Sequence, residues 1–169
     1  MKGNPLDFPL VVKEYTGMVY SLAWRILGNK DDTMDAVQET FSKLYHNRHK
    51  FSKESSLKNW IYTIGINTAR DIYRKRKRKK EVQDVEYYTD SKSHTNPKEL
   101  ENKLFAAKLI EILPLELRIV IVLHYLEDKS IEEIASFLDI SESLVKVRLY
   151  RARKTMLSEY EASCEHEDF

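Results

Sequence analysis

Positive charge gathers in two short stretches of this chain. Residues 74–80 are seven consecutive Lys or Arg side chains. Mutual repulsion makes such a run unfavourable unless a polyanion neutralises it, and Lys and Arg are the side chains that contact nucleic-acid phosphates. The run at 74–80 therefore predicts contact with nucleic acid. A second, more widely spaced set of cations predicts the same contact, and it consists of Lys146, Arg148, Arg151, Arg153 and Lys154.

The overall charge hides this segregation. The 28 Lys and Arg residues nearly balance the 27 Asp and Glu residues, so the net charge is only +1. Residues 81–101, in contrast, contain six acidic side chains and two Lys, and the chain is again acidic after Ser158. The helix dipole also favours cations at a helix C-terminus, but seven in succession exceed what a helix end needs.

Little else in the sequence is suited to chemistry. His46 and His49 are three residues apart, which would place both rings on one helix face, but no third metal ligand follows at a suitable spacing. We find no glycine-rich phosphate loop and no nucleophile motif in the sequence. The single cysteine, Cys164, has no disulfide partner, and we expect it to be exposed. We therefore expect a protein that is not an enzyme and uses no metal or cofactor.

Apolar residues at helical spacing predict the elements that position the first cation run. We expect helices over residues 10–27, 31–47 and 57–80, with Asp31 or Asp32 as the cap of the second helix. The side chains expected to face a core are Val12, Tyr15, Val19, Leu22, Ile26, Met34, Val37, Phe41, Leu44, Tyr45, Trp60, Ile61, Ile64, Thr68, Ile72 and Tyr73.

The middle of the chain predicts a domain boundary. Residues 82–96 are polar and lack a helical period, and a stretch of this length is unusual inside one compact domain. We predict an all-α protein with two small helical domains, residues 1–80 and 102–169, joined by a flexible linker over residues 81–101. The longest apolar run, residues 119–126, is too short to cross a bilayer.

The N-terminus lacks the regions of a signal peptide, so we expect a cytoplasmic protein that is not itself a membrane protein. In the second domain, a first apolar stripe precedes Pro114, and a helix over residues 115–125 follows it. Two more helices are expected from Ser130 to Leu138 and from Ser141 to about Tyr160. The apolar stripe before Pro114 consists of Leu100, Leu104, Ala107, Ile110 and Leu113.

Residues 130–145 predict a helix-turn-helix. Ser130 and Glu133 match a capping box, and the small side chain of Ala135 allows a second helix to cross closely. Ile140 is expected to fill the turn. The residues expected to pack the two helices together are Ile131, Ile134, Leu138, Leu144, Val145 and Leu149.

The second helix of this motif carries the second set of cations. Residues in the N-terminal half of such a helix face base edges in the major groove, and later cations meet phosphates. Taken alone, the motif predicts DNA binding, and a stand-alone helix-turn-helix transcriptional regulator is the alternative at this point. Such a regulator would bind duplex DNA by itself and would not need the first domain.

The order of the motifs resembles a bacterial RNA polymerase sigma factor. The segments 35–41 (DAVQETF), 60–67 (WIYTIGIN) and 71–78 (DIYRKRKR) are similar to the second region of that family. The segments 113–118 (LPLELR) and 145–153 (VKVRLYRAR) are similar to its fourth region. The match covers nearly the whole chain. With these two domains alone, the architecture resembles the extracytoplasmic-function (ECF) group.

The resemblance implies roles for the first domain. The helix containing Asp35, Gln38 and Glu39 would dock on the clamp helices of the polymerase β′ subunit, while Val37 and Phe41 would face the core. The loop at 51–58 and the helix after it would engage the −10 element and help to hold a flipped base. Matching positions for this contact are Asn67, Arg70, Arg74 and Lys75, whereas Trp60 is expected in the core.

The resemblance implies that the second domain reads the −35 element. Many relatives carry a small polar residue where this chain has Val147, which could pack on a thymine methyl or face the core. The expected partners are core RNA polymerase, promoter DNA and an anti-sigma factor that could be membrane-anchored. The chain would then be an alternative sigma factor. Its predicted −35 contacts are Ser141, Ser143, Lys146, Arg148 and Arg151.

Overall fold

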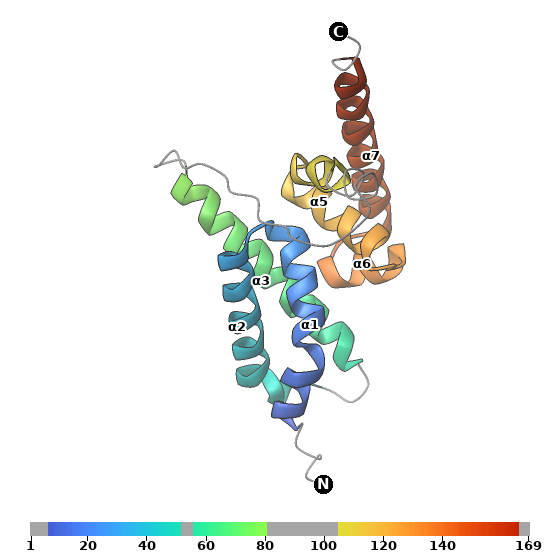
Figure 1. Ribbon diagram of the computed structural model, residues 1–169. Helices are drawn as coiled ribbons and strands as arrows, with labels where there is room; N and C mark the ends of the chain where they lie inside the picture. The colour runs from blue at the N-terminus through green and yellow to red at the C-terminus, as the bar shows by residue number, and fades with distance from the viewer. Residues whose placement is uncertain (1–6, 52–55, 81–104, 166–169) are drawn as a thin grey trace. The chain divides into compact units, whose positions relative to one another are not determined.

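The computed structural model describes residues 7–51, 56–80 and 105–165, and every regular element in these ranges is helical (Figure 1). The described residues fall into two compact units, with residues 7–51 and 56–80 in the first and residues 105–165 in the second. The all-α prediction is therefore confirmed. The predicted linker lies outside the described residues, so its bounds stay a prediction. No helix in these ranges is long and apolar enough to span a membrane.

The first unit contains α1 (Phe8–Leu27), α2 (Lys30–Asn47), a short 3₁₀ turn η1 (Arg48–Lys50) and α3 (Leu57–Lys80). Each of the three long helices packs against the other two, with α3 crossing behind the α1–α2 pair in Figure 1. The predicted bounds of α3 are confirmed. This bundle holds the basic end of α3 beside the start of α2.

The junction between α1 and α2 is shorter than predicted, because α2 begins at Lys30 and not at residue 31. Gly28 ends α1 with a left-handed φ of 72°, and its N–H donates to Trp24 O at 2.8 Å. Asn29 is the extended residue that follows, and its side chain accepts from the Asp32 N–H at 3.0 Å. The cap is thus Asn29, and the predictions of Asp31 or Asp32 were wrong. Both aspartates lie in the first helical turn, where the dipole favours carboxylates.

The core of the first unit is narrower than the predicted stripes. Met34 and Tyr45 are 44% and 46% exposed, so their predicted burial was wrong. The buried face of α2 instead includes Thr33, Ala36 and Thr40, whose small side chains allow close helix packing. Trp60 packs against the core as expected. The predicted core residues that are buried are Val19, Leu22, Ile26, Val37, Phe41, Leu44, Ile61, Thr68 and Ile72.

In the second unit, residues 105–111 are helical and precede α5 (Leu115–Ile121), a π-helical turn η2 (Val122–Leu126), α6 (Ile131–Leu138) and α7 (Glu142–Glu165). The predicted helix over 115–125 therefore changes its hydrogen-bonding period near its end. The last helix extends beyond the predicted end at Tyr160, and Cys164 near its end is exposed as expected.

A buried arginine shapes the turn before α5. Arg118 is 6% exposed and donates to the carbonyls of Glu111 and Leu113. Leu113 is buried in this turn, beyond the helical residues 105–111. Ala107 is exposed within the helical residues 105–111, so its predicted place on a buried stripe was wrong. Leu100 and Leu104 of that stripe lie outside the described residues.

Candidate nucleic-acid interfaces

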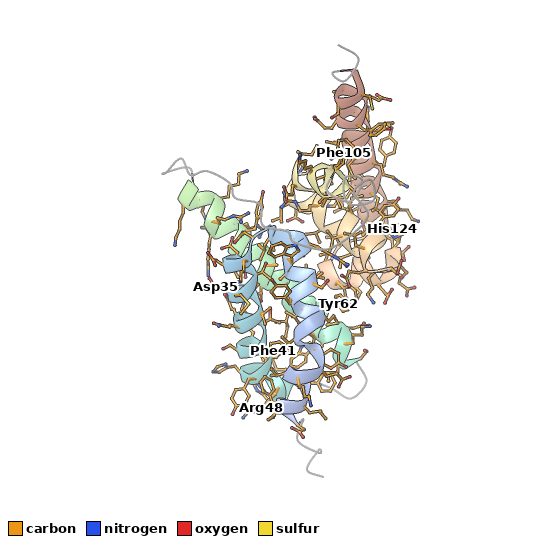
Figure 2. The ribbon with its side chains drawn as sticks, in the orientation of Figure 1. Asp35, Phe41, Arg48, Tyr62, Phe105 and His124 are labelled. Carbon is orange, nitrogen blue, oxygen red and sulfur yellow. The ribbon has the colours of Figure 1, made fainter. Side chains whose placement is uncertain are left out.

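A groove of about 570 Å³ runs between α2 and α3 in the first unit. Its α2 wall carries Asp35, Gln38 and Glu39, the three residues predicted to bind a protein partner, and Figure 2 labels Asp35 and the core residue Phe41 on this helix. Its α3 wall is basic. The structure thus brings together an acidic and a basic wall that are separated in sequence. The remaining lining residues are Asp32, Ser42, Ile72, Lys75, Arg76 and Lys79.

Glu39 is held in place within this groove. Lys43 Nζ lies 2.8 Å from Glu39 Oε1 and donates to Thr68 Oγ1 at 3.2 Å. The same ammonium lies 3.7 Å from Asp71 Oδ2 on α3. Lys43 therefore joins the two walls and orients the Glu39 carboxylate. Asp35 and Gln38 are exposed on the neighbouring turn.

One arginine in the middle of the basic run faces inward. Arg76 Nη1 donates to Asp32 Oδ2 at 2.7 Å and to the Leu27 carbonyl at 3.2 Å. Asn29 Nδ2 donates to the same Asp32 oxygen at 2.8 Å. Arg76 thereby ties the basic end of α3 to the α1–α2 junction. In the sequence, residues 74–80 form one uninterrupted run of cations. No short-range sequence pattern indicates that Arg76 pairs with a residue 44 positions earlier.

The predicted −10 contacts lie on two faces of α3. Asn67, Arg70 and Arg74 are spaced by three and four residues, so they share one face, and Arg70 Nη1 donates to Asn67 Oδ1 at 3.3 Å. Asn67 and Arg74 are exposed there. Lys75 instead lines the groove beside α2. The structure therefore separates Lys75 from the other three residues.

The helix-turn-helix of the second unit is formed by α6, α7 and the turn between them. Glu133 N–H donates to Ser130 Oγ at 3.1 Å, and Ser130 N–H donates to Glu133 Oε2 at 2.9 Å. The predicted capping box is therefore confirmed. The Ser130 N–H bond is the main reason that the pKa of Glu133 lies below its ordinary value. Asp139, with a left-handed φ of 53°, closes α6.

The start of α7 is capped as predicted, since Ser141 Oγ accepts from the Leu144 N–H at 3.2 Å. Val145 and Leu149 are buried, as expected for residues that hold α7 in place. Leu144, however, is 39% exposed, so its predicted packing was wrong. It lies about 100° around the helix from Val145. Val145, Leu149 and Ala152 already occupy the inward face.

The predicted −35 contacts have different surroundings. Ser141, Ser143, Lys146 and Arg151 are exposed. Arg148 Nη1 lies 3.0 Å from Glu116 Oε2 in the first turn of α5, with side chains that are 20% and 32% exposed. Its guanidinium therefore already has a carboxylate partner within the unit. Whether Arg148 also contacts DNA stays a prediction.

The sequence reasoning missed part of the exposed surface of α7. Val147 is 42% exposed and Tyr150 is 63% exposed, so Val147 does not face the core. The signal was available in the spacing, because Val147 lies about 160° around the helix from both Val145 and Leu149, and Tyr150 lies about 140° from Val145. Tyr150 was not considered as a contact.

The histidines of the first unit form no metal centre in the described part of the chain. In these ranges no three His, Cys, Asp or Glu side chains gather as metal ligands. His46 Nδ1 is instead within 2.7 Å of the Ser42 carbonyl on its own helix. His49 lies in η1, beyond the end of α2.

Comparisons with known proteins match both units. Residues 11–79 match the family model for sigma-70 region 2, and residues 106–156 match that for sigma-70 region 4. The ECF RNA polymerase sigma-E factor of Escherichia coli K12 is 32% identical over 167 residues, which cover 92% of this chain and 87% of that protein. The RNA polymerase sigma factor SigV of Bacillus subtilis is 33% identical over 140 residues, covering 81% of each chain.

Two solved structures have a similar fold. The sigma factor RpoE of Bartonella quintana, in complex with the anti-sigma factor NepR, has a TM-score of 0.72 at 24% identity and covers 92% of this chain and 97% of its own. CnrH, in complex with the cytosolic domain of CnrY, has a TM-score of 0.66 at 27% identity. That match covers 95% of this chain and 91% of CnrH.

Proposed function

This chain belongs to the ECF group of RNA polymerase sigma factors, and on that premise we propose how its surfaces divide the work of promoter recognition. The first unit binds core polymerase through α2 and the −10 element through α3. The second unit reads the −35 element through α7. Members of this family are transcription initiation factors without catalytic activity of their own.

The acidic wall of the α2–α3 groove supports the polymerase contact, and it is the observation on which the proposal chiefly depends. Asp35 and Gln38 project from exposed positions, and Lys43 preorganises Glu39. Because a carboxylate fixed before binding loses less conformational entropy, this wall suits a basic helical partner. We assign that partner as the clamp helices of the polymerase β′ subunit.

The outward face of α3 supports the −10 contact. Asn67 offers an amide that can hydrogen-bond a base, and Arg74 is an exposed cation on the next turns of the same face. Arg70, which is hydrogen-bonded to Asn67, restricts the orientation of that amide. Lys75 lies in the groove, so a role in phosphate binding there would bring DNA close to the polymerase contact.

The exposed start of α7 supports reading of duplex DNA at the −35 element. Ser141 and Ser143 flank the helix N-terminus, and Lys146 and Arg151 extend the polar surface along the helix. The N-terminal half of a recognition helix is the part that faces base edges.

An anti-sigma factor is a further proposed partner. One solved relative was determined with an anti-sigma factor and another with a cytosolic domain of a second protein. The groove residues Asp35 and Gln38 would be shared by such a partner and polymerase, so the two would compete. Competition between purified core polymerase and an anti-sigma factor for the chain tests this idea. Simultaneous binding of both would contradict it.

In vitro transcription with core polymerase on a library of promoters tests the central proposal. We expect initiation from a specific subset of sequences that depends on both upstream and downstream elements. Lys146→Ala with Arg151→Ala should weaken dependence on the upstream element, with each lost base contact costing about 1–3 kcal/mol. Asp35→Ala with Gln38→Ala should weaken polymerase binding while leaving the fold intact, since both positions are exposed. Binding of the chain alone to duplex DNA with no response to polymerase would instead favour a stand-alone regulator.

A further inference from the structure

Three exposed apolar side chains form a row along the first half of α7. Leu144, Val147 and Tyr150 are spaced by three residues, and 39%, 42% and 63% of each is exposed. Side chains three apart on a helix are neighbours, so the three form one continuous strip. We call Leu144, Val147 and Tyr150 the apolar row.

Packing within the second unit does not account for this row. The inward face of α7 is already formed by Val145, Leu149 and Ala152, all of which are buried. Isolated exposed apolar residues are common on protein surfaces, but neighbouring ones mark a contact surface more often. The row lies on the second helix of a helix-turn-helix, whose exposed face is the part that enters a groove of DNA.

The charges around the row indicate the chemistry of its occupant. Lys146, Arg151 and Lys154 are exposed on the same helix and flank the row. A strip of apolar side chains bordered by cations is complementary to a polyanion that presents apolar groups between its charges. The major groove of DNA fits this description, because its base edges carry one apolar group, the C5-methyl of thymine, between two phosphate backbones.

We propose that the apolar row reads thymine methyl groups in the upstream promoter element. This inference rests on the proposed function of α7 and adds the chemistry of its specificity. Leu144 to Tyr150 spans about 9 Å along the helix axis, since each residue rises about 1.5 Å. That length matches roughly three base pairs at about 3.4 Å each. The row therefore requires thymine at one or more of up to three adjacent pairs, and Lys154, the flanking cation farthest from the helix start, binds a phosphate beside them.

The test removes the methyl group without changing the hydrogen bonds of the base. Promoters are first selected from a library with the full chain and core polymerase. Each thymine in the selected upstream element is then replaced singly by deoxyuridine, and holoenzyme affinity and initiation are measured. We expect a loss of about fourfold at one or more adjacent positions, the factor for burying one methyl group.

Substitutions in the protein connect each methyl to a side chain. At each position that shows a deoxyuridine effect, at least one of the variants Leu144→Ala, Val147→Ala and Tyr150→Ala should reduce that effect towards none. Leu157→Ala is the matched control, because Leu157 is 56% exposed on the same helix but lies beyond the helix-turn-helix. That control should keep the full deoxyuridine effect.

Several results would overturn the inference while leaving the proposed function in place. The first is that the selected upstream elements contain no thymine. The second is that no deoxyuridine replacement changes holoenzyme affinity or initiation. The third is that the deoxyuridine effect persists in all three variants of the apolar row. Equal loss of initiation at every promoter in the row variants would show that a protein surface covers the row instead. Failure of the chain to direct any promoter-specific initiation is a different result, because it would remove the proposed function itself.

Discussion

The basic stretches of α3 and α7 differ in how their cations are arranged. On α3, Arg74–Lys80 are contiguous, so charge surrounds the helix on all sides. On α7, buried and exposed apolar residues separate the cations from Lys146 to Arg153. Each helix also commits one arginine to an internal ion pair, Arg76 with Asp32 and Arg148 with Glu116.

This difference separates two ways of binding nucleic acid. A contiguous cation run attracts phosphates whatever the base sequence, because it presents charge without patterned base contacts. Spaced cations between apolar and hydroxyl side chains can match a particular series of base edges. The internal ion pairs play the same part in both helices, since each sets the position of a helix that carries exposed cations.

The largest expected effect comes from neutralising the exposed cations of α3. Arg74→Gln, Lys77→Gln and Arg78→Gln together should lower holoenzyme affinity similarly at all promoters. The slope of log affinity against log salt should fall by about two to three, because each lost phosphate contact removes about 0.7–0.9. Binding titrations over a range of salt concentrations would measure this. A loss of affinity confined to promoters with one base sequence would show that α3 recognises bases. It would contradict the difference drawn between α3 and α7.

Loss of the Arg76 ion pair should destabilise the first unit. Arg76→Met removes a charged hydrogen bond to Asp32 and one to Leu27 O, and such bonds contribute about 1.5–3 kcal/mol each. Because both side chains of the pair are about one-fifth exposed, we expect a total loss of about 2 kcal/mol in the free energy of unfolding. Chemical denaturation measures it. Lys77→Met is the matched control, since Lys77 is an exposed cation of the same run, and it should cost under about 0.5 kcal/mol.

The Arg148 ion pair gives a smaller and more selective effect. If Arg148 positions α7 on α5 without contacting phosphate, Arg148→Gln should lower upstream affinity several-fold while the salt slope stays unchanged. Lys154→Gln, at an exposed cation of the same helix, should instead reduce that slope by about 0.9. The reversed pair, Glu116→Arg with Arg148→Glu, should restore much of the affinity. A reduced salt slope in Arg148→Gln would show that Arg148 meets the DNA.

The capping box of α6 should give the smallest effect. Ser130→Ala is expected to cost about 1 kcal/mol of stability at neutral pH. The pKa of Glu133 is lowered in the folded state by the Ser130 N–H, so its contribution is complete above the ordinary value of 4.5 and disappears as the pH falls through the lower folded value. Unfolding of Glu133→Gln should therefore depend less on pH below about 4.5 than unfolding of the parent chain. Equal pH dependence in both would contradict this role.

Local rules were sufficient for much of this protein. The bounds of α3, the capping box at Ser130 and the cap at Ser141 follow from short-range patterns, because a helix start or a capping bond involves residues three or four apart. Family motifs then indicated the polymerase and promoter surfaces. The site predictions for Asp35, Gln38 and Glu39 fall together in one groove, although their roles stay predictions.

The sequence by itself thus determined the bounds of α3, the caps at Ser130 and Ser141 and the two concentrations of charge. The pairing of Arg76 and Arg148 was decided by the tertiary structure alone, because their partners Asp32 and Glu116 lie 44 and 32 positions away in the sequence. The same holds for Leu144, Met34 and Tyr45, whose exposure depends on how wide a face each neighbouring helix covers. A helical period fixes the angle between side chains, and packing between helices decides which of those angles points to solvent.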